Sequence, residues 1–294
     1  NSKSKFVAYN ICMRKPQPTL PTRPITGHKG TFGNLLVIGG HESKADLMFG
    51  GAALAGIGAL RTGIGKCMFA MPEEILKEAI EIVPQATGFV LSEASLGELQ
   101  NYANKNSNCV LIGPSLGIGQ FQKNTLETIL KCEKPLVIDA DGLNLIATNP
   151  EIFKAKQTII TPHSLEFERL LGAFDINGSG DKSADNLASK LNTVVVLKNS
   201  RTYITDGNKH FVLDKPNSAL ATAGSGDLLS GIIAGLTTQF YPNDLGLLEI
   251  AKLGVEIHSK SAELWSDKHG DRGALITEIA NLIPEAIGIL KNES

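Results

Sequence analysis

Residues 217–239 read NSALATAGSGDLLSGIIAGLTTQ and are the most informative stretch of the chain. A loop of small residues, 221–226, leads to Asp227, and apolar residues then recur at helical spacing. This pattern predicts a glycine-rich turn that opens a helix packed against a core. Gly224 and Gly226 can adopt positive φ angles and let a ligand approach the backbone, because they have no side chain.

The start of this predicted helix is a candidate site for an anion. The first turn of a helix has N–H groups without carbonyl partners, and the helix dipole favours negative charge there. A carboxylate, Asp227, stands at the mouth of that site. One interpretation is an ordinary N-cap. The other is a base beside groups that stabilise phosphate, which suits phosphoryl transfer.

The chain has the composition of an ordinary soluble globular protein. Its 294 residues are 42% hydrophobic and 20% charged, enough to bury a large core in one α/β domain or two small ones. The net charge of −2 gives no electrostatic reason to expect binding to nucleic acid or membranes. The four cysteines lack CxxC spacing and no apolar run approaches membrane-spanning length, so we expect a cytoplasmic protein with reduced cysteines.

Short apolar runs alternate with helical patterns along most of the chain. Strands are predicted at 35–38, 66–69, 88–91, 109–112, 136–138, 158–161, 194–197, 202–205 and 210–213. Helices are predicted at 49–62, 73–82, 96–105, 120–131, 166–171, 182–190, 245–265 and 275–290. The last two strands meet at Asp206-Gly207, a hairpin signal. The alternation predicts an α/β fold with one doubly wound, mostly parallel sheet and helices on both faces.

The distribution of prolines divides the chain into two segments. Closely spaced prolines in residues 1–25 predict an extended arm that lies over the body or over a neighbouring subunit. Residues 26–294 show no linker and no internal repeat, so we expect them to form a single domain.

Polar turns follow several predicted strands, where the ligands of a doubly wound sheet bind. Asp139 begins the turn DADGLN, and paired acids at a strand end commonly face a metal or a phosphate. In TPHSLE, Glu166 could orient water around magnesium and His163 could hydrogen-bond a substrate. Lys198 ends a buried run and could contact phosphate. The alternative for Glu166 is a first-turn carboxylate favoured by the helix dipole, and the alternative for Lys198 is a surface lysine. The polar residues of DADGLN could instead have ordinary turn and capping roles. His258 is interpreted as structural or solvated.

Taken together and in this order, these turns resemble the ADP- or ATP-dependent NAD(P)H-hydrate dehydratase family of the ribokinase-like superfamily. The similarity is greatest to stand-alone members of bacterial type and covers about residues 25–290. Its motifs are HKGTFGNLLVIGG (28–40), GGAALAGIGALRTGIGK (50–66), GPSLG (113–117), DADGLN (139–144), TPHSLE (161–166), VVVLKNSRTYITDG (194–207) and NSALATAGSGD (217–227).

The resemblance implies a lyase that repairs a damaged cofactor. Such an enzyme removes water from the hydrated nicotinamide ring of NADHX or NADPHX and regenerates NAD(P)H. It splits ADP to AMP and phosphate, or ATP to ADP and phosphate. Resemblance to the stand-alone members favours ADP as the donor.

The resemblance also implies roles for residues. Asp227 is the implied catalytic base, which draws the proton from the ring hydroxyl as this group attacks the terminal phosphoryl group. Magnesium is implied between the phosphates, with Asp139, and Glu166 through water, as candidate protein ligands. The implied anion hole is Ala223, Gly224, Ser225 and Gly226; the hydrate-binding residues are Ala52, Gly117, His163 and Asp227; and the nucleotide-binding residues are Lys198, Asn199, Ser200, Arg201, Thr202 and Gly226.

Several positions depart from the usual family pattern. Glycine is most common where this chain has Ser115 and Asn199, and proline-glycine is most common where it has Ser164-Leu165. None of these changes removes the carboxylate, the histidine or the lysine, but lost glycines could tighten a loop and alter affinity.

The resemblance also implies an oligomer, because the family often forms homotetramers. We expect no room in this chain for an epimerase domain, so an epimerase would be a separate partner.

Two other functions use the same residues. The first is a small-molecule kinase of the same superfamily, of the hydroxyethylthiazole or pyrimidine type, which would leave phosphate on its product. The second is a non-catalytic nucleotide sensor. The motifs TPHSLE and HKGTFG favour the dehydratase over the kinase, and a carboxylate at Asp227 is not needed in a sensor.

Overall fold

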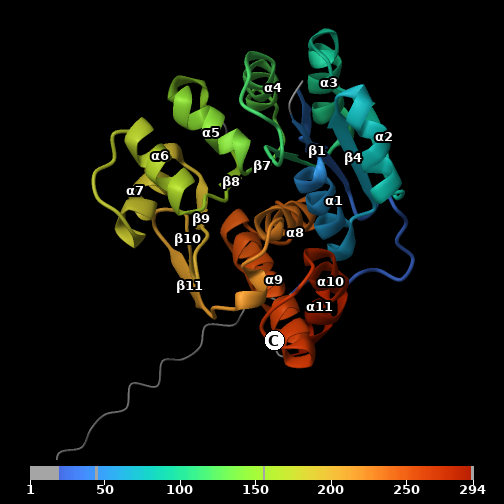
Figure 1. The fold of residues 1–294 in the computed structure, drawn as a ribbon, viewed down its shortest axis with the longest axis vertical. Coiled ribbons are helices and arrows are strands. Elements are labelled where there is room, and N and C mark those ends of the chain that lie inside the picture. Colours follow the sequence, from blue (N-terminus) through green and yellow to red (C-terminus); the bar gives the residue numbers. More distant parts are fainter. Residues whose placement is uncertain (1–19, 44–45, 155, 293–294) are drawn as a thin grey trace, which may run out of the picture.

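The computed structural model describes residues 20–43, 46–154 and 156–292, so most of the predicted arm lies outside the described residues. Within these ranges, one sheet contains nine strands in the order β11-β10-β9-β8-β7-β6-β1-β4-β5 (Figure 1). Their bounds are β1 Asn34–Ile38, β4 Lys66–Met71, β5 Ala86–Val90, β6 Cys109–Ile112, β7 Leu136–Ile138, β8 Thr158–Ile160, β9 Val194–Leu197, β10 Arg201–Thr205 and β11 His210–Asp214.

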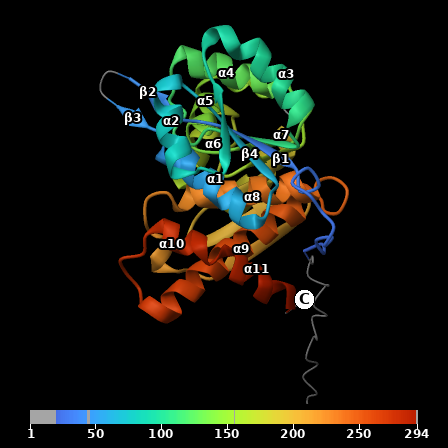
Figure 2. The ribbon, with the colours of Figure 1, turned by 90° about the vertical axis from the view of Figure 1, so that its right-hand side faces the viewer.

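The sheet is parallel from β5 to β9, and the β10–β11 hairpin is added at its edge. β1 pairs in parallel with β4 on one side and with β6 on the other. β10 runs antiparallel to both β9 and β11, as the Asp206-Gly207 turn predicts. A small second sheet, β2 His41–Glu42 with β3 Leu47–Met48, projects from the body (Figure 2). The sequence did not predict it, because two-residue strands show no alternation.

Eleven α-helices occur among the described residues. They are α1 Gly50–Thr62, α2 Glu73–Ile82, α3 Leu96–Asn106, α4 Gln120–Leu130, α5 Asp141–Thr148, α6 Ser164–Ala173, α7 Asp181–Leu191, α8 Ser225–Phe240, α9 Leu247–His269, α10 Ile276–Asn281 and α11 Ile283–Asn292. The predicted helix at 275–290 is therefore two helices. Pro284 has no N–H to bond back to Ala280, so one continuous helix cannot form there. None of these helices combines the length and apolarity needed to cross a lipid bilayer.

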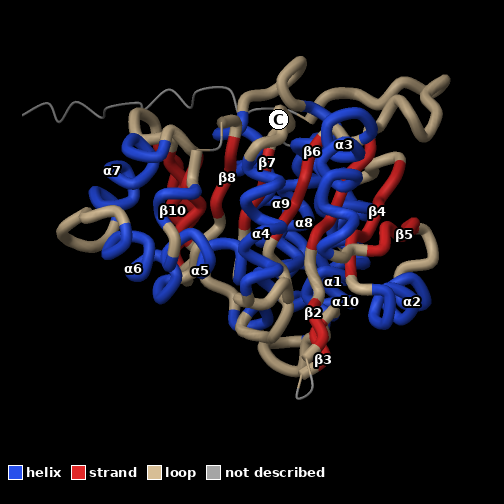
Figure 3. Tube along the Cα trace, turned by 90° about the horizontal axis from the view of Figure 1, so that it is seen from above, coloured by secondary structure: helices blue, strands red, loops and turns tan. Residues whose placement is uncertain are grey.

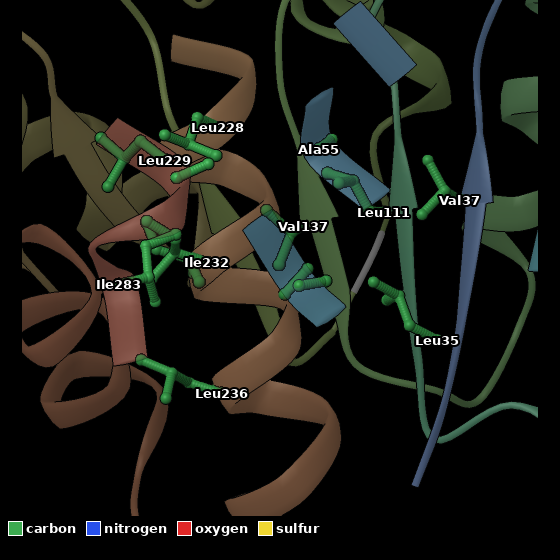
Figure 4. Close-up of a cluster of buried hydrophobic side chains, with 14 of the residues drawn as sticks. Leu35, Val37, Ala55, Leu111, Val137, Leu228, Leu229, Ile232, Leu236 and Ile283 are labelled. Carbon is green, nitrogen blue, oxygen red and sulfur yellow. The ribbon is translucent and has the colours of Figure 1, made fainter. Parts of the chain in front are cut away.

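Helices cover both faces of the sheet, which confirms the predicted doubly wound α/β fold (Figure 3). Successive residues of a strand point to opposite faces, so each strand supplies two cores. Leu35 and Val37 belong to the core that the sheet shares with α1, α8 and α9, and Figure 4 shows them in one cluster with Leu111 and with Ile232 of α8. Leu36 and Ile38, which alternate with them in β1, belong to the core that the sheet shares with α3 to α7 on the other side.

α1 and α8 are packed backbone to backbone. A methyl group added to Gly231 of α8 would overlap the carbonyl oxygen of Ala55 in α1. The small residues of α1, predicted to pack closely against a sheet, therefore also allow close approach of a second helix. Both helices begin at the same edge of the sheet, so their first turns lie side by side (Figure 1).

Candidate active site

The glycine-rich turn places Asp227 in the first turn of α8. Gly224 precedes the helix with φ 86°, in the left-handed region that glycine adopts without strain. A side chain at Gly224 would also overlap Leu54 of α1. Backbone conformation and packing thus both require glycine at position 224. The turn that this glycine forms sets the direction of α8, and so the position of the carboxylate of Asp227 in its first turn.

One of the N–H groups predicted to bind an anion, that of Ser225, already has a carbonyl partner. The N–H of Ser225 donates to the carbonyl oxygen of Thr222 at 3.3 Å, and the N–H of Leu228 donates to Gly224 at 2.9 Å. Helical geometry leaves the N–H groups of Gly226 and Asp227 without a carbonyl in the preceding turn. These two groups are the best placed to bind an anion.

Lys198 adds a positive charge to the same place. Its ammonium group donates to Oδ1 of Asp139 at 2.6 Å, and the carboxylate of Asp139 is only 1% exposed. A Cβ added to Gly226 would lie 3.2 Å from Nζ of Lys198, so the ammonium group lies directly over the start of α8. A cation and the helix N–H groups therefore face the same space.

His163 and Glu166 are held in a reciprocal cap at the start of α6. Glu166 accepts a hydrogen bond from the N–H of His163 at 2.8 Å, and Nδ1 of His163 accepts from the N–H of Leu165 at 3.1 Å. Nδ1 is therefore unprotonated, and Nε2 lies 3.3 Å from Oε1 of Glu166. Glu166 thus lies in the first turn of α6, as the helix-dipole alternative predicts, and the cap, which the sequence did not predict, fixes the orientation of the imidazole ring.

Burial and nearby charges raise the pKa of Asp227. Burial raises its pKa to about 6, the negative charge of Asp139 adds to the increase, and Lys198 opposes it. Burial likewise raises the pKa of Glu166, again against the effect of Lys198. Three carboxylates thus share one lysine, and an acid whose pKa lies close to working pH is suited to accept a proton.

The turn after β6 brings Ser115 and Gly117 to the same edge. Ser115 has φ 55°, in the left-handed region that glycine adopts most readily, and its Oγ accepts from the N–H of Gly51 at 3.2 Å. The N–H of Gly117 donates to Oδ2 of Asp141 at 2.9 Å. A Cβ at Gly51 would lie 2.9 Å from Oδ1 of Asp227, so the carboxylate faces the start of α1. The side chain of Ala52, the next residue of α1, is fully buried.

A pocket of about 740 Å³ opens beside the start of α8. Five of the six predicted nucleotide-binding residues line it: Lys198, Asn199, Ser200, Thr202 and Gly226. The sixth, Arg201, points elsewhere, because its guanidinium group forms two hydrogen bonds with Asp181 of α7. The pocket has the size of sites that hold cofactors or nucleotides.

His258 of α9 also lines this pocket, although the sequence suggested only a structural role. Its Nε2 lies 3.4 Å from Oγ of Ser225. Burial lowers the pKa of His258 to about 4, and Lys198 adds to this effect, so the ring is neutral near neutral pH. The sequence shows His258 on the apolar face of a predicted helix, which could have indicated a place in the site. It could not show which loop this helix face contacts.

Comparison with known proteins identifies the family. A model of the NAD(P)H-hydrate dehydratase family matches residues 35–285. The Bifunctional NAD(P)H-hydrate repair enzyme of Coxiella burnetii is 36% identical over 267 residues, which cover 89% of this chain and 52% of the relative. The ADP-dependent (S)-NAD(P)H-hydrate dehydratase of Bacillus subtilis is 31% identical over 271 residues, which cover 90% of this chain and 93% of the relative. The chain thus spans about half the length of the bifunctional relatives.

Solved structures agree with this assignment. A ribokinase-like superfamily protein from Enterococcus faecalis has a TM-score of 0.80 at 25% identity, with 92% of each chain covered. The ADP/ATP-dependent NAD(P)H-hydrate dehydratase from Bacillus subtilis, co-crystallized with ATP/Mg2+, has a TM-score of 0.76 at 28% identity, with 92% of this chain and 95% of the other covered. The predicted ribokinase-like fold is confirmed. Because the family model matches most of its residues, this chain belongs to the NAD(P)H-hydrate dehydratase family.

Proposed function

We propose that this chain dehydrates NAD(P)H hydrate to NAD(P)H and splits ADP, or alternatively ATP, as it does so. The names of its relatives support the reaction class and the nucleotide. The observation that carries the proposal is the position of Asp227. This carboxylate, with its pKa raised to about 6, faces the start of α1, while its own helix start and Lys198 border the pocket.

The proposed mechanism assigns one role to each group. Asp227 accepts the proton of the ring hydroxyl, whose oxygen attacks the terminal phosphorus atom of the nucleotide as the bond to the bridging oxygen breaks. The N–H groups of Gly226 and Asp227, together with Lys198, stabilise the negative charge on the transferred phosphoryl group. The C–O bond then breaks, phosphate leaves instead of hydroxide, and loss of a proton from the adjacent ring carbon restores the double bond.

The substrates would occupy two neighbouring regions. Ser200 and Thr202 line the pocket with Lys198 and would bind the nucleotide. His163, with its ring fixed by Glu166, borders the same pocket and would contact the hydrate from the other side. The N–H of Gly117 already bonds Asp141, so contact at Gly117 would use other atoms of that turn.

Magnesium would fit as an ion carried by the nucleotide. Among the described residues, no three His, Cys, Asp or Glu side chains are placed to hold a metal ion by themselves. Asp139 is bonded to Lys198 and Glu166 to His163, and both side chains are buried, so either carboxylate would reach a hydrated ion only through water. When bound, magnesium would neutralise charge on the phosphates; the solved Bacillus subtilis relative, co-crystallized with ATP/Mg2+, supports its presence.

Three further expectations remain part of the proposal. We infer a cytoplasmic homotetramer from the family resemblance, and a light-scattering mass of one chain would refute the tetramer. The relatives named as bifunctional repair enzymes support a functional link to a second repair activity. By resemblance, that activity is the epimerase that interconverts the two hydrate epimers.

The test is direct. Purified protein is mixed with hydrated NADH, magnesium and either ADP or ATP, and absorbance of the reduced nicotinamide ring is followed. We expect a rise that depends on nucleotide and that disappears in Asp227→Asn, while nucleotide binding persists. Full activity of Asp227→Asn would refute the role of the base. No rise from folded protein that binds nucleotide would favour the kinase, to be followed by a screen of alcohol substrates for a phosphorylated product.

A further inference from the structure

Two side chains in loops next to the pocket are bonded to each other. Ser164 is the first residue of α6, directly after His163, and Asn199 directly follows Lys198 after β9. Oγ of Ser164 donates a hydrogen bond to Oδ1 of Asn199 at 2.6 Å, although the two residues are 35 positions apart. Neither proline in place of Ser164 nor glycine in place of Asn199 could form this bond, because neither has the polar side-chain atom that it needs.

The bond extends a backbone connection between two loops. The N–H of Lys198 donates to the carbonyl oxygen of Pro162 at 2.8 Å, and His163 pairs with Lys198 in a parallel bridge. The bond between Ser164 and Asn199 lies one residue beyond this bridge. It therefore fastens the turn between β9 and β10 to the start of α6, past the point where the strands themselves end.

Both fastened loops border the pocket. Asn199 lines it next to Lys198, and His163 lines it from the loop before α6. The hydroxyl of Ser164 donates to Oδ1, so the Nδ2 group of Asn199 keeps its two N–H donors for a ligand in the pocket. Glycine at this position would offer no donor, and its backbone would have more conformations to lose when a ligand orders the turn.

We propose that Ser164 and Asn199 form a positioning pair that preorganises the nucleotide side of the pocket and couples it to the His163 loop. Binding of nucleotide then strengthens binding of the hydrate, and binding of the hydrate strengthens binding of nucleotide. Each ligand orders the same unit, which is the turn after β9 joined to the loop before α6. This inference rests on the proposed function and adds a regulation of the same site. Neither residue takes part in the transfer of the phosphoryl group.

A double-mutant cycle tests the pair. ADP affinity is measured by calorimetry for the wild type, Ser164→Ala, Asn199→Ala and the double variant. Loss of one hydrogen bond predicts about three- to tenfold weaker ADP binding in Ser164→Ala. The double variant should bind ADP no more weakly than Asn199→Ala alone, because Ser164 acts only through Asn199. Purely additive losses, or an unchanged affinity in Ser164→Ala, would overturn the pair.

The coupling has its own readout. In an Asp227→Asn background, which removes the proposed base and so prevents reaction, ADP affinity is measured with and without NADH hydrate at a concentration shown to saturate that variant. We expect the hydrate to tighten ADP binding when Ser164 is present, and the effect to shrink towards a factor of one in Ser164→Ala. A structural role alone would not change this ratio. An equal ratio in both proteins would refute the coupling.

Controls separate this inference from the proposed function. Asn124, a half-buried asparagine of α4, likewise has an Oδ1 that accepts from a side chain, that of Gln120. Asn124→Ala should leave ADP affinity unchanged, and the unfolding temperature of the ligand-free variants should match the wild type. Wild-type protein that neither binds ADP nor restores nicotinamide absorbance would refute the proposed function and this inference together. Normal wild-type activity with no coupling would refute this inference alone.

Discussion

At the scale of single residues, the site is organised by one lysine among three carboxylates. Lys198 is bonded to Asp139, so only part of its charge is available to lower the pKa of Asp227 and Glu166. The excess negative charge, together with burial, keeps the proton affinity of Asp227 high. The same shortage of positive charge favours a ligand that arrives with a cation.

The pKa of Asp227 predicts the acid side of the activity profile. The base form is required, so kcat/KM should fall about tenfold per pH unit below about pH 6. Asp139→Asn removes the negative charge with the largest effect on the pKa of Asp227. The fall in kcat/KM should therefore move to lower pH. Nicotinamide absorbance at saturating ADP, followed from acid to neutral pH, measures both profiles. Asp181→Asn, which removes a carboxylate of the α7 surface, is the control, and a profile that does not move in Asp139→Asn would contradict the electrostatic argument.

Single residues show how far sequence reasoning reaches. Asp227, Lys198 and His163 could be selected from the sequence because each lies in a turn at a strand end or at the start of a helix, where ligands bind. Their partners could not be predicted, since Lys198 and Asp139 are 59 positions apart and only the strand order brings them together. Arg201 was predicted with its neighbours, but its side chain turns to Asp181.

At the scale of elements, the position of the base depends on the packing of α8 against α1. Gly231→Ala would push the two helices apart, because the new methyl group overlaps the carbonyl oxygen of Ala55. We expect a loss of about 1–3 kcal/mol in the free energy of unfolding. Gly288 of α11 has no other part of the described chain within 4 Å of an added Cβ. Gly288→Ala should therefore stabilise the protein by about 0.5–1 kcal/mol.

Denaturant unfolding of the two alanine variants checks this prediction. Both variants replace glycine by alanine within a helix, so both gain the same helix propensity. The difference between their free energies of unfolding therefore reports packing alone. Equal effects in both variants would show that α1 and α8 adapt to the added methyl group.

Element bounds were predictable where burial is two-sided. The inner strands of the main sheet lie between helices, so they are short continuous apolar runs, and each predicted strand end falls within two residues of the observed one. The hairpin of β2 and β3 lies outside both cores, and its two-residue strands, His41–Glu42 and the exposed Leu47–Met48, carry no such signal. The division between α10 and α11 follows from Pro284, a local effect that an overall helical pattern hides.

At the scale of the whole molecule, the strand order explains where the site lies. The chain passes from β1 to β4 in one direction along the sheet and places β6 on the opposite side of β1. The turns after β1 and β6 therefore separate at a switch point, where doubly wound folds bind ligands. Asp227 faces Gly51, after β1, whose N–H bonds Ser115, after β6. Sequence predicted the edge of the sheet but not this point along it.

A base held in this environment should lower the stability of the whole fold. The pKa of Asp227 is raised from 3.8 to about 6, so the folded state binds its proton more tightly than the unfolded state. The stabilisation linked to this proton is complete below the unfolded pKa and is lost as pH rises through about 6. Asp227→Asn removes the titration. The ligand-free variant should therefore gain stability over the wild type as pH rises, by about 2–3 kcal/mol at neutral pH.

Denaturant unfolding of the ligand-free wild type and Asp227→Asn, repeated from about pH 4 to about pH 8, measures this difference. Asp244→Asn, at an exposed carboxylate, controls for the loss of one charge. A difference that grows from about pH 4 to about pH 6 and then levels off, in Asp227→Asn alone, would show that the fold holds this carboxylate at the expense of stability. A constant difference would mean that the folded protein does not raise the pKa of this carboxyl. The activity profile would then have to arise from another group.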